Sequence, residues 1–186
     1  ITAMVLKYRV PRRAENPSEM AVQDAQRALS VVRSKAKDSG LAPDRIGVLG
    51  FSAGGNAASL VAVNNAKQTY ETVDAVDEIS FRPDFGIIIY GAWMADDKTG
   101  ELKPECTPTK ETPPLFFAHA ADDHVKCEGS IAMFLALKNL GTPSELHIYD
   151  AGGHGYGLRR DEKFPVTTWP ARCEDWLARH GWLKQK

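Results

Sequence analysis

The sequence predicts an α/β fold in which a mostly parallel sheet is covered by helices on both faces. Two observations support this prediction: apolar, β-favouring runs alternate with segments of helical periodicity, and most of those runs are continuously apolar. Continuous runs are typical of strands that are buried on both faces, and alternation of strands with helices is typical of parallel sheets with right-handed crossovers. Because 186 residues suit one folding unit, we expect a single domain over residues 1–186.

Five runs are rich in apolar, β-favouring residues and are predicted as strands. They cover residues 2–8, 46–51, 85–90, 115–119 and 145–149.

Four segments between or after these runs are predicted as helices. They cover residues 19–38, 55–66, 130–140 and 168–179. In the first, apolar residues recur at helical spacing, Ser18 is a suitable N-cap and Gly40 is a stop signal.

Residues 91–114 form a long polar connection that contains four prolines. Connections of this length in a small domain are usually functional or mobile. The segment is too polar to be an apolar lid.

The composition excludes several classes of partner. Hydrophobic residues make up 43% of the chain and charged residues 25%, with a formal net charge of −1. We therefore expect no nucleic-acid partner and no attraction to an anionic membrane, and no apolar run is long enough to span a bilayer. Three cysteines are too few for a disulfide framework, although one pair could bridge. The chain begins with Ile1 and shows no signal peptide, so the sequence predicts no compartment.

The run Gly50-Phe51-Ser52-Ala53-Gly54 is a G-x-S-x-G motif with a predicted strand before it and a predicted helix after it. In that context the serine projects from a sharp turn as a nucleophile, and the glycines relieve crowding of the backbone. The first N–H groups of the helix, that of Ala53 above all, would face the negative charge that develops during acyl transfer. The alternative is a tight turn without a catalytic serine. It accounts less well for the predicted strand before the motif and the predicted helix after it.

A nucleophilic serine needs a histidine base, and His154 is the candidate because it lies in a glycine-rich loop after the last predicted strand. Of the other four histidines, His119 ends a buried strand, His147 lies on a strand face and His180 adjoins a helix-ending glycine. His124 follows two aspartates in a loop, next to the expected acid.

The acid that orients the base is expected in the loop after residues 115–119, where Asp122 and Asp123 stand side by side. The residues alone do not decide between them.

The segments "VLKYRVP", "PDRIGVLGFSAGGNAAS" and "PSELHIYDAGGHGYGLR" resemble α/β-hydrolase esterases, and the resemblance spans essentially the whole chain. The resemblance is strongest to the acetyl-xylan and feruloyl esterase-like group, which is often labelled xylanase-associated lipases. The resemblance to hormone-sensitive-lipase-like esterases is weaker. The acid of that group usually stands in a D-x-x-V pattern, which Asp122 and Val125 fit, so the resemblance assigns the acid role to Asp122, with Asp123 as the alternative.

The departure from the family is at the front of the chain. Relatives carry an upstream strand and an H-G-G-G-like loop that supplies a second oxyanion donor, whereas this sequence starts after them. We therefore expect a sheet without its N-terminal strands, a single donor from Ala53, and a homodimer formed through the exposed first strand at residues 2–8.

Together these features predict a serine carboxylic-ester hydrolase without cofactor or metal, acting on short acyl esters of a small molecule or of plant polysaccharide. Trp93 and Tyr156 are candidate substrate contacts, each with core packing as the alternative. Two other functions compete: a serine peptidase of the oligopeptidase type, and a non-catalytic hydrolase domain.

Overall fold

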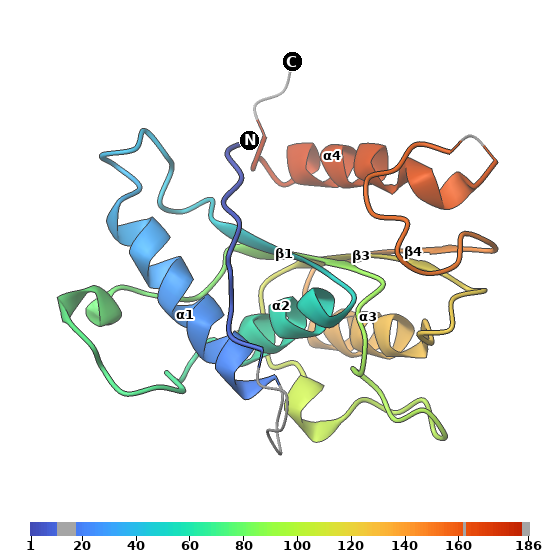
Figure 1. The fold of residues 1–186 in the computed structure, drawn as a ribbon, viewed down its shortest axis with the longest axis horizontal. Helices are drawn as coiled ribbons and strands as arrows, with labels where there is room; N and C mark the ends of the chain where they lie inside the picture. The colour runs from blue at the N-terminus through green and yellow to red at the C-terminus, as the bar shows by residue number, and fades with distance from the viewer. Residues whose placement is uncertain (11–17, 162, 184–186) are drawn as a thin grey trace.

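The computed structural model describes residues 1–10, 18–161 and 163–183, and its centre is a parallel sheet of four strands (Figure 1). The strands are β1 (Gly47–Phe51), β2 (Phe85–Ile89), β3 (Leu115–Ala120) and β4 (Glu145–Tyr149). Each strand pairs in parallel with the one that follows it in the chain, which gives the spatial order β1-β2-β3-β4. The predicted α/β class is confirmed.

Helices cover both faces of the sheet. They are α1 (Glu19–Ser34), α2 (Ala53–Val63), α3 (Glu128–Leu140) and α4 (Trp169–Arg179), with short 3-10 helices η1 (Ala75–Glu78), η2 (Pro104–Cys106) and η3 (Pro165–Thr168). Helices α1, α2 and α3 lie on one side of the sheet and α4 lies on the other (Figure 1).

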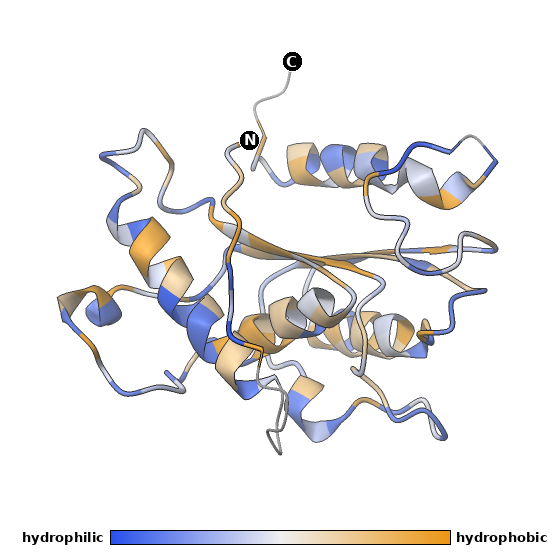
Figure 2. Ribbon diagram, in the orientation of Figure 1, coloured by the Kyte–Doolittle hydropathy of each residue, from blue (hydrophilic) through white to orange (hydrophobic). Residues whose placement is uncertain are grey.

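Two apolar cores flank the sheet, which explains why its central strands are continuously apolar. All six residues of β3 are buried. On one face Phe117 packs with Met133 of α3, and on the other Phe116 lies 5.6 Å from Trp176 of α4 between ring centroids. The hydrophobic colouring is accordingly concentrated on the strands and on the helix faces beneath them (Figure 2).

The strand predicted at residues 2–8 is absent, and residues 1–10 form an irregular, largely exposed segment. Val5, for example, is 98% exposed. The segment is anchored to α1 and not to the sheet: the Arg9 backbone N–H donates to the Asp24 carboxylate at 2.7 Å, and the Arg9 guanidinium pairs with the same group. An apolar composition alone therefore does not make residues 2–8 a strand, because a strand also needs a neighbouring strand for its backbone hydrogen bonds.

The helix boundaries differ from the predicted ones by a few residues. Helix α1 ends at Ser34, whereas α2 and α3 each begin two residues earlier than predicted. Ser18 precedes α1 as predicted, but its hydroxyl makes no capping bond and instead donates to Asn56 Oδ1 at 2.7 Å. That bond ties the start of α1 to α2.

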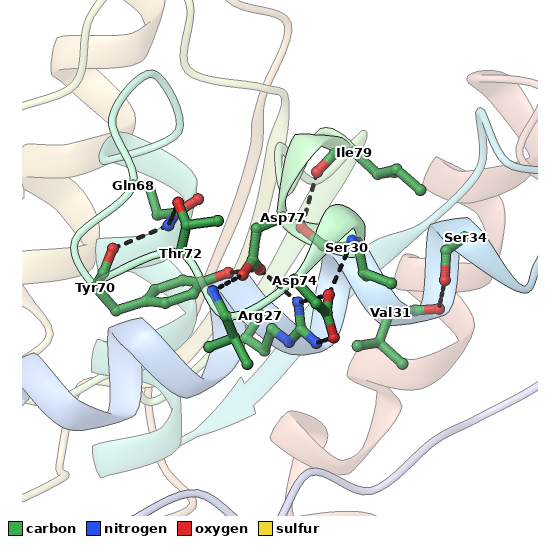
Figure 3. A network of polar contacts seen from close by, with 12 residues as sticks. Arg27, Ser30, Val31, Ser34, Gln68, Tyr70, Thr72, Asp74, Asp77 and Ile79 are labelled. Carbon is green, nitrogen blue, oxygen red and sulfur yellow. Dashed lines mark hydrogen bonds and ion pairs between the residues drawn. The ribbon is translucent and has the colours of Figure 1, made fainter.

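The connection between α2 and β2 is fastened to α1 by a network of charged and polar side chains (Figure 3). Arg27 of α1 forms ion pairs with Asp74 at 2.8 Å and with Asp77 at 2.6 Å, and Tyr70 donates its hydroxyl to Asp77 at 2.6 Å. Burial by itself would raise the pKa of Asp77, but hydrogen bonds from Tyr70, the Val73 N–H and Arg27 outweigh it and hold that pKa well below its ordinary range. The network thus depends on an ionised Asp77.

Cys106, Cys127 and Cys173 are all free thiols, so the structure forms no disulfide among them. Within the described residues, no helix has both the length and the apolar character needed to cross a bilayer.

Candidate active site

Ser52 lies in a sharp turn between β1 and α2, and its backbone has φ 53° and ψ −118°. A positive φ is uncommon for a residue with a side chain, and such strain is concentrated at functional sites. The turn is tight because β1 and α2 touch: a Cβ placed on Gly50 would lie 2.0 Å from the carbonyl oxygen of Gly54. Only glycine therefore fits at position 50.

The second glycine of the motif is not needed for space. A Cβ on Gly54 would meet only the Tyr8 hydroxyl, at 3.8 Å, whereas one on Gly55 would lie 2.9 Å from the Cα of Gly91. The expectation that glycines on both sides of Ser52 relieve crowding thus holds for Gly50 but not for Gly54.

The carboxyl ends of the parallel strands bring three polar side chains together. Ser52 follows β1, Asp123 follows β3 and His154 follows β4. Ser52 Oγ lies 2.9 Å from His154 Nε2, and His154 Nδ1 lies 2.8 Å from one Asp123 carboxylate oxygen and 3.0 Å from the other. This is the order of contacts, hydroxyl to imidazole to carboxylate, that activates a serine.

Asp122, the acid favoured by the resemblance, does not contact His154, so this prediction is wrong. Its side chain is directed to the backbone of the His154 loop, where Oδ1 accepts a hydrogen bond from the Gly153 N–H at 2.8 Å. Hydrogen bonds from the N–H groups of Gly153 and then Gly152 lower the pKa of Asp122. Consecutive residues of a turn point in different directions, and only Asp123 is turned inward.

Asp123 is held within the turn that carries it. Its side chain is fully buried, and Oδ1 accepts a hydrogen bond from the Val125 N–H at 2.8 Å. A second histidine, His119, lies 3.5 Å from Asp123 Oδ2 and is itself fully buried. Burial is the largest cause that lowers the pKa of His119, so its imidazole is neutral at neutral pH. The sequence predicts for His119 only the end of a strand; a histidine within an apolar run is the signal that points to a buried polar contact.

Tyr156 does not line the site, contrary to the prediction. It is only 5% exposed, its hydroxyl donates to the Ala118 carbonyl at 2.9 Å, and its ring packs edge-on against Tyr90 at 4.5 Å between centroids. Tyr90 in turn lies 4.8 Å from the His154 ring. Tyr156 is therefore a core residue that supports the wall behind His154.

Trp93 does reach the site. A cavity of about 560 Å³ opens above Ser52 and His154, and Trp93 lies on its wall with 58% of its surface exposed and a φ of 57°. The rest of the lining is mostly polar and comes from two segments, Ala92 with residues 94–100, and residues 124–126 with Glu128 and Gly129. Lys126 joins these two segments by donating to the Asp97 carbonyl at 2.5 Å. The predicted polar loop 91–114 therefore forms a wall of the site.

Ala53 is the first residue of α2, so its N–H has no acceptor within the helix and lies at the positive end of the helix dipole. The role of Ala53 as an oxyanion donor stays a prediction that this position is consistent with.

One cluster has the ligand types of a metal site. Donor atoms of Asp123, His124 and His154 lie within 4.8 Å of one another. Asp123 and His154 are already hydrogen-bonded to each other, however, and we assign no metal to them.

A parallel sheet with covered faces and a serine on the turn after β1, within reach of a histidine and an aspartate, defines the α/β hydrolases. The comparisons with known proteins agree. The family model BD-FAE matches residues 2–89. The crystal structure of an acetyl ester-xyloside bifunctional hydrolase from Caldicellulosiruptor lactoaceticus superposes with a TM-score of 0.81 at 33% identity, covering 96% of this chain and 71% of that one. The chain belongs to this family of α/β-hydrolase esterases.

Two curated relatives are more distant. An acetylxylan esterase from Xylanibacter ruminicola is 26% identical over 182 residues, covering 85% of this chain and 35% of that protein. Endo-1,4-beta-xylanase B from Butyrivibrio fibrisolvens is 25% identical over 184 residues, covering 88% of this chain and 29% of that protein. The chain thus spans about a third of the length of these curated relatives.

Proposed function

We propose that this chain is a serine carboxylic-ester hydrolase, in which Ser52 is the nucleophile, His154 the general base and acid, and Asp123 the carboxylate that orients His154. The observation that carries the proposal is the 2.9 Å contact between Ser52 Oγ and His154 Nε2, with His154 Nδ1 held by a buried carboxylate. Family membership adds support, because its named relatives include ester hydrolases.

In the proposed reaction, Ser52 Oγ attacks the ester carbonyl carbon while His154 Nε2 takes the hydroxyl proton. The carbonyl oxygen becomes an oxyanion and accepts a hydrogen bond from the Ala53 N–H. The tetrahedral intermediate collapses as His154 returns the proton to the leaving alkoxide, which departs as an alcohol and leaves an acyl-serine. Water, activated by His154, then releases the carboxylic acid and regenerates Ser52.

We further propose that the ester carries a short acyl group, acetyl above all, on a carbohydrate alcohol such as plant polysaccharide, with feruloyl esters as the other candidate. The mostly polar lining of the cavity supports a hydrated alcohol and offers little apolar surface to a long chain. Trp93, exposed on the wall, supplies a flat apolar face of the kind against which a sugar ring packs. The printed names of the acetyl ester-xyloside hydrolase and the acetylxylan esterase point to the same chemistry.

A serine-directed phosphonate tests the mechanism. Mass spectrometry should find one adduct, on Ser52, and Ser52→Ala should abolish both the adduct and the hydrolysis of p-nitrophenyl acetate while its thermal midpoint stays close to that of the wild type. Adducts on another serine, or full activity of Ser52→Ala, would refute the assignment.

The two competing functions give different results with the same protein. A peptidase would cleave peptidyl p-nitroanilides as well as the ester, whereas an esterase would leave these amides intact, and a non-catalytic domain would turn over neither substrate. Release of acetate from acetylated xylan, measured against release of ferulate from a feruloyl ester, then separates the two proposed acyl groups.

A further inference from the structure

His119 is a buried histidine that the proposed reaction does not use. It lies near the end of β3, none of its surface is exposed, and it does not line the cavity above Ser52. A neutral imidazole has one N–H donor and one nitrogen acceptor, and both need partners in a buried position.

The contacts of His119 define its tautomer. Nε2 lies 2.9 Å from the Val125 carbonyl oxygen, which can only accept, so Nε2 carries the hydrogen. Nδ1, 3.0 Å from Ser130 Oγ, must then accept from that hydroxyl. Ser130 belongs to α3 and is also fully buried. The imidazole is therefore fixed at both ends, between a helix and a turn.

The turn that His119 holds is the one that presents the acid. Val125 receives the His119 hydrogen bond on its carbonyl and donates its own N–H to Asp123 Oδ1 at 2.8 Å. Nε2 of His119 also lies 3.5 Å from Asp123 Oδ2, the oxygen that is 2.8 Å from His154 Nδ1. A further titratable group beside this carboxylate, His124, is exposed and lies 3.5 Å from Oδ1.

We propose that His119 is a positioning residue, held by Ser130, which fixes Val125 and thereby keeps the Asp123 carboxylate directed at His154. The inference rests on the proposed function of Ser52 and His154. Without the imidazole, the turn after β3 would lose its tie to α3, and the buried carboxylate would lose both the fixed Val125 N–H and the neighbouring N–H of His119. A displacement of about 1 Å in such a group can lower the rate about 10²-fold.

Kinetics of three substitutions test this role with p-nitrophenyl acetate. His119→Leu should lower kcat about 10²-fold, because the turn that carries Asp123 loses its tie to α3. His119→Gln keeps a side-chain N–H that can reach the Val125 carbonyl, and it should recover at least about tenfold of that loss. Ser130→Ala removes one buried hydrogen bond and should lower kcat about three- to tenfold.

Matched controls separate positioning from general damage. His147→Leu alters a histidine on β4 that pairs with Glu145, and Ser59→Ala removes a buried hydroxyl that donates to the Asn56 carbonyl within α2. Both should retain wild-type kcat. A proton NMR readout adds an independent measure: the low-field signal of the His154 Nδ1–H bonded to Asp123 should be lost in His119→Leu and retained in the controls.

The outcomes distinguish this inference from the function on which it rests. If the phosphonate labels Ser52 in the wild type but folded His119→Leu and Ser130→Ala keep their kcat and the low-field signal, the positioning role is refuted and the function stands. If these variants lose activity only in proportion to the unfolded fraction, the role is likewise refuted. If the wild type is not labelled at Ser52, the proposed function itself fails.

Discussion

Exchanging the two neighbouring aspartates for asparagine, one at a time, tests the geometry of the site most directly. In Asp123→Asn the amide oxygen would still accept the Val125 N–H, so the NH₂ group would face His154 Nδ1. Nδ1 would then have to accept, and the imidazole hydrogen would move to Nε2, beside Ser52 Oγ. In that tautomer His154 cannot take the serine proton. A Ser–His–Asp arrangement with this fault typically loses about 10⁴ in kcat, or about 5.4 kcal/mol.

Asp122→Asn is the matched control, since it makes the same replacement of one carboxylate oxygen by NH₂ at the adjacent residue. Asparagine Oδ1 can still accept from the Gly153 N–H, and the lost charge is exposed. Water screens a charge in this position, so its loss should change the rate by about fivefold at most. Steady-state kinetics on p-nitrophenyl acetate, with circular dichroism to check folding, gives both values. A larger loss in Asp122→Asn than in Asp123→Asn would refute the assignment of the acid.

Four other predictions concern the fold, the substrate and association. Gly50→Ala should cost about 3 kcal/mol or more in unfolding free energy and abolish activity, whereas Gly54→Ala should be tolerated; similar urea midpoints for the two would contradict the backbone clash at position 50. Initial rates should fall about tenfold or more from p-nitrophenyl acetate to the octanoate, and a flat profile would mean that the cavity accepts long chains. Asp77→Asn should lower Tm at neutral pH, and its gap to the wild type should begin to close below about pH 4, because a carboxyl whose folded pKa is lowered stabilises only while ionised. Because apolar side chains of residues 1–10 such as Val5 are exposed, sedimentation velocity should detect self-association that Val5→Lys weakens, and a monomer at every concentration would contradict this prediction.

The sheet was largely predictable, because four of the five apolar runs pair in parallel with a neighbouring strand. The run at residues 2–8 has the same composition but no partner strand. Pairing is a long-range property, and a local pattern of apolar residues does not reveal it.

Site residues could be predicted where their local sequence context identifies them. They could not be predicted where the role depends on the direction in which a turn points the side chain. Ser52 and His154 are singled out by their glycine-rich surroundings, and the structure places them in contact. Asp122 and Asp123 have the same side chain at adjacent positions, so only the path of the backbone through the turn assigns the inward direction to Asp123. Likewise, the roles of Tyr156 and His119 depend on Ala118, Ser130 and other partners that the sequence does not place beside them.

The strand order has a consequence for how this protein is made. Because each strand adds beside the one before it, the sheet can assemble from its first strand onward as the chain leaves the ribosome. Ser52, however, is separated from His154 by 102 positions. At a synthesis rate of about 5–20 residues per second, the nucleophile exists for about 5–20 s before its base has been translated. The nascent chain is therefore expected to be inert toward esters until the loop after β4 has been translated and docks.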